Sequence, residues 1–264
     1  MTFLSSQNAL AAGLAASQSE MWQPILQVLP KDKGVFNANL RQQVRNHLDL
    51  SLATGEDSNQ SDEQLEKNLV ARLSVLDKNL SKYIRVSESS SRFEQLKRLM
   101  PALYKIEERK LIEKLLKKRA VKIPNLRNRR LLAFLDKRIS RLANSLIFNM
   151  KALVRERRDY EPDLIKSMAE FGIEFSARPP DFILDYHLID GGKNQKGEWL
   201  VQGYIALLGQ YEMLVVTVEK ELDIQAKTME EAYVKSVHVL AELIINQLLE
   251  FLVEEKSHKK VKGM

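Results

Sequence analysis

The residues whose type and spacing could do chemistry are lysines and arginines in the middle of the chain. They gather in the stretch KKRAVKIPNLRNRRLLAFLDKRISR, residues 117–141. Clustered cations bind polyanions, because each phosphate contact releases condensed counterions. The candidate residues for binding an anion or a partner are Lys117, Lys118, Arg119, Arg127, Arg129, Arg130 and Arg138.

The charge distribution along the chain also indicates a binding role for this stretch, but it does not identify the ligand. Residues 81–160 hold 23 Lys and Arg against 8 Asp and Glu, a net +15, whereas the whole chain carries +6. The simplest interpretation is a solvated helix face, because apolar residues alternate with the cations at helical spacing. The alternatives are contact with an acidic protein surface, with anionic lipid headgroups, or with nucleic acid along 114–141. Proteins that bind single-stranded nucleic acid stack its bases on aromatic side chains, and Phe134 is the only aromatic residue in the basic stretch.

Other residue types point away from catalysis and metal binding. The chain has no cysteine, which excludes a thiol nucleophile and thiolate ligands. The segment 191–197, GGKNQKG, lacks the spacing of a phosphate-binding loop. Asp181, Asp185 and Asp190 would need a cleft to act as acid and base. None of the histidines has a partner at metal-ligand spacing: His47, His187, His238 and His258. We therefore expect no cofactor, no metal and no enzymatic activity, with an enzyme of unrecognised site as the remaining alternative.

The first part of the chain, residues 1–143, is predicted to be all helical. Apolar spacing predicts helices over 6–28 and 36–52, with an exposed polar loop over 54–64. Ser and Glu or Gln three residues apart predict helix starts at Ser61 and Ser91. Pro101 is expected to start, end or kink a helix, and Pro124 marks a further break. A short helix follows, with one apolar side formed by Leu131, Leu135, Ile139 and Leu142.

The sequence pattern is different over residues 144–256. It predicts an α+β domain with the element order β-α-β-β-β-α. A short apolar run over 145–154 reads as a strand, with a helix as the alternative. The segment 161–175 predicts a helix of roughly two to three turns that begins near Pro162 and ends at Gly172. Three runs between 181 and 224 are rich in β-branched and aromatic residues. A long amphipathic helix follows Thr228. Short connections favour an antiparallel sheet, so the fold class is α+β, with a two-layer domain and a small, mostly antiparallel sheet. Residues 257–264 form a basic flexible tail.

The C-terminal domain resembles small bacterial envelope lipoproteins. These are the flagellum-associated outer-membrane lipoproteins and the lipoprotein activators of penicillin-binding proteins. The resemblance lies in DLIKSMAEFGIEF, PPDFILDYHLID, GEWLVQGYIALL and TMEEAYVKSVHVLAELIINQL. It implies a non-enzymatic binding or assembly role in the cell envelope. The sequence departs from these lipoproteins in having no lipobox cysteine and no basic start before its N-terminal ALAAGLAAS stretch.

Together these observations predict a non-enzymatic binding or assembly protein. A protein partner or an envelope component comes first, and nucleic acid is the alternative. We expect a periplasmic or envelope-associated location, with the cytoplasm as the alternative. No apolar run reaches 18 residues, so no membrane span is expected. The edges of a small sheet also allow strand pairing with a partner.

Overall fold

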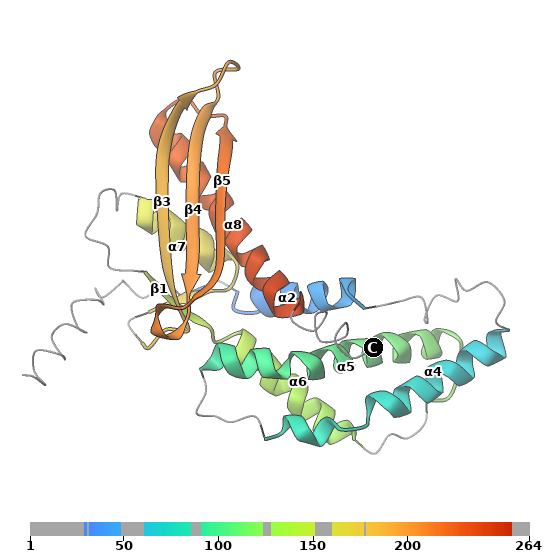
Figure 1. Cartoon of the computed structure of the whole chain (residues 1–264). Helices are drawn as coiled ribbons and strands as arrows, with labels where there is room; N and C mark the ends of the chain where they lie inside the picture. The colour runs from blue at the N-terminus through green and yellow to red at the C-terminus, as the bar shows by residue number, and fades with distance from the viewer. Residues whose placement is uncertain are drawn as a thin grey trace, which may run out of the picture. The chain divides into compact units, whose positions relative to one another are not determined.

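The structure is a computed structural model that describes residues 29–30, 32–48, 61–85, 91–123, 128–150, 160–176 and 178–254. The chain divides into two compact units (Figure 1). The helical unit comprises Gly34–Ser145 with Leu249–Met264. The α+β unit comprises Met1–Lys33 with Leu146–Leu248. The expected helix over 6–28, the break at Pro124 and the basic tail lie outside the described residues.

The helical unit is built from amphipathic helices whose starts are fixed by side-chain caps. Its elements are α2 (Val35–Asn46), α4 (Asp62–Leu76), the 3₁₀ turn η1 (Leu80–Tyr83), α5 (Arg92–Lys118) and α6 (Arg129–Ala143). The hydroxyls of Ser61 and Ser91 accept hydrogen bonds from the amides of Gln64 and Glu94 at 3.3 and 3.2 Å. Both expected helix starts are therefore confirmed.

Helix α5 continues through Pro101 without a break. Pro101 therefore neither starts nor ends a helix, and the third expected outcome, a kink, stays a prediction. Proline inside a helix removes one hydrogen bond and costs about 3 kcal/mol. Burial offsets this cost, because Leu99 and Leu103 on either side of Pro101 are fully buried. Tertiary packing outweighs the local preference at this position.

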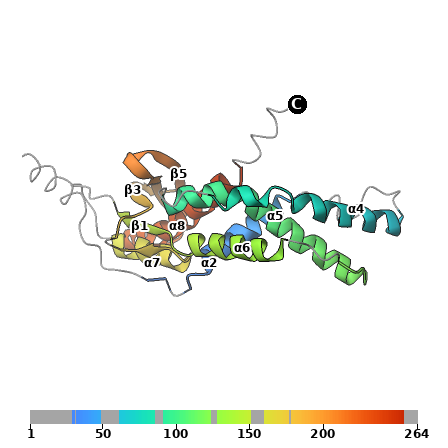
Figure 2. The ribbon, with the colours of Figure 1, turned by 90° about the horizontal axis from the view of Figure 1, so that it is seen from below.

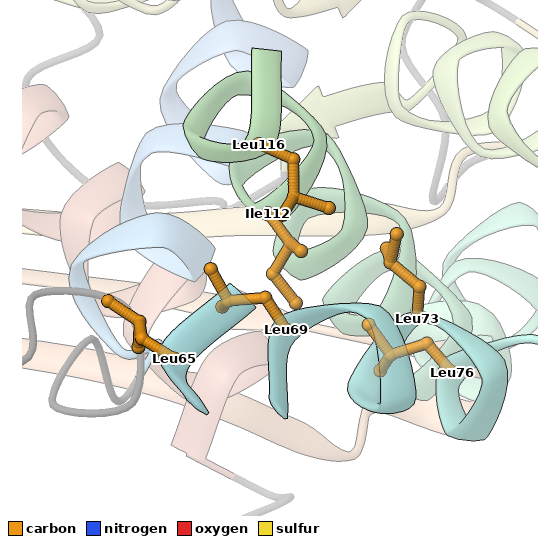
Figure 3. Close-up of a cluster of buried hydrophobic side chains, with 6 residues drawn as sticks. All are labelled: Leu65, Leu69, Leu73, Leu76, Ile112 and Leu116. Atoms are coloured by element: carbon orange, nitrogen blue, oxygen red, sulfur yellow. The ribbon is translucent and has the colours of Figure 1, made fainter. Parts of the chain in front are cut away.

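The core of the helical unit lies along α5. Figure 2 shows α5 with α4 and α6 beside it, and α5 also packs against α2. Four leucines of α4 point toward Ile112 and Leu116 of α5 (Figure 3). The four leucines are Leu65, Leu69, Leu73 and Leu76. They recur every three or four residues and form the apolar stripe that the sequence predicts.

The α+β unit contains a five-stranded mixed sheet. Its elements are β1 (Ile147–Met150), α7 (Glu161–Glu170), β2 (Glu174–Phe175), β3 (Phe182–Lys193), β4 (Trp199–Leu208), β5 (Leu214–Ile224) and α8 (Met229–Glu254). The strand order is β2-β1-β3-β4-β5, with β1 parallel to β2 and β3 and the remaining pairs antiparallel. The α+β fold class is confirmed. The short strand β2 was not expected, since the sequence pattern ends the preceding helix at Gly172 and assigns no strand to the residues that follow.

Helix α8 covers one face of the antiparallel strands (Figure 1). Thr228 caps it, accepting from the Glu231 amide at 3.2 Å, as the sequence predicts. Gly203 of β4 permits the close approach, because a Cβ there would lie 2.8 Å from Leu240 Cδ1. Among the described helices, only α8 is long and apolar enough to cross a membrane, and more than half of its most apolar stretch is buried. We interpret α8 as the core helix of this unit.

Replacing Gly203 by alanine is expected to destabilise the α+β unit. The added methyl group meets the buried Leu240 side chain, and overpacking of this kind costs about 1–3 kcal/mol. Urea denaturation of the full chain measures the loss. In a Leu240→Ala background the same substitution should cost less, because the opposing branch is gone. An equal cost in both backgrounds would contradict this contact.

The end of α8 belongs to the helical unit, so the domains are not consecutive in sequence. Phe251 stacks on Phe93 at a ring-centroid distance of 6.4 Å. The Tyr104 hydroxyl donates to the Val253 carbonyl at 3.1 Å, and burial raises the pKa of Tyr104 to about 12. The sequence placed one boundary at 143/144. The structure places it at 145/146 and adds a second within α8.

Candidate functional site

The helical unit presents a set of exposed cations, which we call the cationic surface. All lie on the end of α5, just after it, or on α6, and none forms an ion pair with another described residue. They are Lys114, Lys117, Lys118, Lys122, Arg129, Arg130, Lys137 and Arg141. Since no carboxylate among the described residues neutralises them, their charge is available to an external anion.

The α5 part of this surface is a lysine ridge beside a shallow cavity of about 550 Å³. The cavity is lined by Lys110, Glu113, Lys114, Lys117 and Lys118. Their spacing of three and four residues places them on one face of the helix. Two of them are already paired: Glu113 contacts Arg109 at 2.8 Å, and Lys110 contacts Asp136 of α6 at 3.2 Å. The cavity is therefore bordered by three lysines with no carboxylate partner.

The α6 part is a stripe of cations around one exposed aromatic ring. Arg130, Phe134, Lys137 and Arg141 recur at intervals of three or four residues, so they share a face. Phe134 is 51% exposed. The opposite, apolar face of α6 is buried in the unit's core. That face is unavailable to lipid, which distinguishes α6 from an amphipathic helix lying in a membrane surface.

The structure separates the candidate residues that the sequence grouped together. Lys117, Lys118, Arg129 and Arg130 lie on the cationic surface. Arg119 is also exposed but pairs with Asp62 at 2.6 Å. Arg127 lies outside the described residues.

Arg138 does not belong to the surface. Its side chain is buried, and its guanidinium donates to the Ile84 carbonyl at 3.1 Å and to Gln95 Oε1 at 3.3 Å. Its role is structural, because a buried guanidinium that is hydrogen-bonded within the unit is not available to an external anion. The residues that the candidate set omitted are Lys114, Lys122, Lys137 and Arg141. Lys114, Lys137 and Arg141 lie at helical spacing from candidate cations, so the sequence alone could have identified these three.

A buried ion cluster holds the helices beneath this surface. The Glu107 carboxylate, fully shielded from solvent, contacts Arg41 at 2.5 Å and Arg45 at 2.8 Å, both from α2, and Lys110 at 3.1 Å. Arg41 also reaches Asp136 of α6 at 2.8 Å. Burial acts to raise the pKa of Glu107, but the Lys110 charge and the hydrogen bonds from Arg45 and Arg41 outweigh it, so this pKa lies below its ordinary value. The carboxylate therefore stays ionised and ties α2 and α6 to α5.

A second cavity, of about 520 Å³, lies in the α+β unit between α7, the end of β5 and α8. Within it Ser167 Oγ and His238 Nδ1 lie 3.2 Å apart. No carboxylate among the described residues contacts His238 to orient it, and Ser167 is 7% exposed. We interpret the pair as a hydrogen bond that holds α7 to α8, since a nucleophile and base need an orienting partner and access for a substrate.

Of the three aspartates considered as an acid and base, Asp185 lies on β3 with its carboxylate 3.6 Å from His187 Nε2, and the other two are held by backbone amides. Asp181 is buried just before β3, where its carboxylate accepts from the Ile147 amide at 3.0 Å. Asp190 accepts from the Gly192 amide at 2.7 Å in the hairpin. The described residues also contain no cluster of side chains suited to hold a metal ion.

Comparison of the chain with protein-family models, with curated proteins and with solved structures finds no match.

Proposed function

We propose that this protein is a non-enzymatic binding or assembly protein whose helical unit binds an acidic macromolecule through the cationic surface. The observation that supports the proposal is the group of exposed Lys and Arg side chains on α5 and α6 that no described carboxylate neutralises. A field of one sign attracts a partner of the opposite sign and accelerates encounter. The buried Glu107 cluster supports this role because it fixes the two helices that carry the charges.

An acidic protein is the partner we favour. The cationic surface is interrupted by the carboxylates of Glu113 and Asp136, both about a third exposed. Both carboxylates are paired with cations of the unit, so a continuous phosphate backbone would cross these sites without gaining an ion pair. A protein surface can place its carboxylates only opposite the unpaired lysines and arginines. The burial of the apolar face of α6 argues against a lipid surface.

Neutralising three cations of the surface is expected to weaken this binding by roughly 3- to 100-fold, since exposed charge pairs contribute about 0.2–1 kcal/mol each. The variant is Lys117→Gln with Arg130→Gln and Lys137→Gln. The probe is a fluorescent helical peptide with glutamate at every fourth position, titrated with the full chain at about 50 mM salt. Fluorescence anisotropy measures the affinity.

The matched control removes the same charge elsewhere on the helical unit. Lys78, Arg85 and Arg98 are exposed and unpaired with any described carboxylate, so their replacement by glutamine gives an equal change in net charge. We expect the control variant to bind as the wild type does. An equal loss in both variants would mean that net charge alone attracts the peptide, which would contradict a defined surface.

Nucleic acid is the second candidate, because Phe134 lies exposed among Arg130, Lys137 and Arg141. An aromatic ring beside cations stacks with an unpaired base. Labelled single- and double-stranded oligonucleotides form a separate arm of the same titration. Tighter binding to the single strand than to the acidic peptide, with loss on Phe134→Ala, would replace the protein partner by nucleic acid.

The cell envelope remains the setting we propose. It is supported by the resemblance of the sequence of the α+β unit to envelope lipoproteins. Fractionation of cells that express the native gene product tests this setting. Recovery in the periplasmic or membrane fraction supports it, and recovery in the cytosol alone contradicts it.

A further inference from the structure

The antiparallel strands have a second face, opposite α8. The pairing of β3, β4 and β5 fixes which side chains share it, because directly opposed residues point to the same side. One row across the sheet is His187, Tyr204 and Glu219, and the next is Ile189, Gln202 and Glu221. In the described part of the chain both helices of this unit lie on the other side of these strands (Figure 1).

Carboxylates form a continuous row on this face along β5. Glu219, Glu221 and Asp223 alternate along the strand, so all three point to the same side. All three side chains are exposed. Glu219 and Glu221 have no cationic partner among the described residues, and Asp223 accepts a hydrogen bond from Asn194 at 3.1 Å. We call these three residues the acidic row.

Strand β5 is also an edge of the sheet. Among the strands that the structure describes, it is the last in the order and pairs only with β4. Alternate backbone N–H and C=O groups of an edge strand point away from the sheet and can pair with another chain. Met213 just before the strand and Leu214 at its beginning are 67% and 57% exposed. The edge therefore combines free backbone groups, an apolar start and a row of negative charge.

We propose that β5 receives an extended, basic segment of a partner protein as an added strand. In this arrangement backbone hydrogen bonds supply affinity, and the acidic row selects the side chains. The added strand carries Lys or Arg at alternate positions, since only those positions lie opposite Glu219, Glu221 and Asp223. An apolar residue at the other end of the segment covers Leu214.

Tyr204 adds a reason to favour arginine at one of these positions. Its ring lies on β4 directly opposite Glu219, with the His187 ring 5.7 Å away on the far side. A guanidinium group that reaches over Glu219 can stack on the Tyr204 ring while it pairs with the carboxylate.

The charge of the acidic row argues against a second copy of this chain as the occupant. An antiparallel pair of β5 strands centred on Glu221 would place Glu219 opposite Asp223 of the other copy. Like charges directly opposite each other destabilise a strand pair. The same charges attract a cationic strand, so complementarity selects a different, basic chain.

The experiment uses the full chain and a fluorescein-labelled ten-residue peptide in which Lys or Arg alternates with Val. We expect saturable binding by anisotropy at about 50 mM salt. Glu219→Gln with Glu221→Gln should weaken it roughly 2- to 30-fold, the range for two cross-strand charge pairs. Glu230→Gln with Glu242→Gln on α8 removes the same exposed charge away from the row and should leave binding unchanged. An unchanged affinity in the first variant, or an equal loss in both, would overturn the proposal.

A modified peptide distinguishes strand addition from charge attraction alone. Methylation of every second backbone nitrogen removes the hydrogen bonds of one edge and keeps every charge. We expect one of the two possible methylation patterns to abolish binding and the other to retain it. Retention by both patterns would overturn strand addition. Sedimentation velocity supplies the last check, because a β5-mediated dimer, lost on Glu219→Pro but not on the α8 substitutions, would identify a second copy as the occupant.

Discussion

Replacement of Glu107 by alanine is expected to lower the free energy of unfolding by about 3–5 kcal/mol, the cost of breaking a buried ion pair from one side. Arg41 is 8% exposed and would lose the carboxylate that it contacts at 2.5 Å. Asp136 and Ser140 remain as partners of Arg41, so part of its charge stays compensated. Urea denaturation followed by circular dichroism measures the loss.

The adjacent residue provides the control. Glu108 pairs with Arg72 at 2.6 Å, but the Arg72 side chain is 43% exposed and solvent screens the pair. Glu108→Ala should therefore cost about 1 kcal/mol or less. If Glu107→Ala prevents folding altogether, Glu107→Gln keeps the shape and still removes the charge. Equal stabilities of the Glu107 and Glu108 variants would show that the buried cluster does not hold the unit together.

The pH dependence of stability has a defined sign for Glu107. Its folded-state pKa lies below the ordinary value of 4.5, so the folded protein binds its proton less readily than the unfolded chain. The stabilisation is fully present above pH 4.5 and is lost as the pH falls through the folded pKa. In Glu107→Gln this part of the acid sensitivity should disappear, which a series of urea midpoints below pH 5 would detect.

Replacement of Phe148 by alanine is the second substitution with a large expected effect, about 3–5 kcal/mol for a buried phenylalanine. Phe148 lies on the central parallel strand β1 and is fully buried. Its ring contacts those of Phe182 on β3 and Phe175 on β2, with centroids 5.0 and 6.2 Å away. The substitution would leave a cavity where three strands meet. The near-ultraviolet circular dichroism of the variant should therefore be lost at a lower urea concentration than that of the wild type.

The control for Phe148 is another phenylalanine with a different environment. Phe134 is 51% exposed, so Phe134→Ala should change stability by no more than about 0.5 kcal/mol. A comparable loss in both variants would contradict the burial of Phe148. A neutral Phe148→Ala would mean that β1 and β2 contribute little to the core.

The sequence predicts what depends on periodicity and capping. The leucine stripe of α4 and the three capping serine and threonine residues lie where local spacing places them. Gly203 is different, because its importance comes from Leu240, which follows much later in the chain. Strand β2 has two residues, too few to show any period. Pro101 contradicts its local preference because the core on either side of it outweighs the lost hydrogen bond.

The candidate surface is predictable in composition but not in detail. Arg138 lies three residues after Leu135 and four before Leu142, so helical spacing alone places it near the buried side of α6. The pairing of Arg119 with Asp62 cannot be inferred, since 57 residues separate the two. The Glu107 cluster likewise joins residues far apart in the chain. Only the structure separates the cations that are paired from those that are available.

The helical unit can complete its core only after the last turns of α8 have been synthesised. Phe251 and Val253 complete the packing around Phe93 and Tyr104, yet they are synthesised roughly a hundred residues after Ser145. At about 5–20 residues per second, ribosomes need on the order of 5–20 s to cover that interval. Throughout it the ring of Phe93 lacks its stacking partner, and the helical unit emerges with part of its core exposed. We therefore expect chaperones to bind mainly to the helical unit during translation.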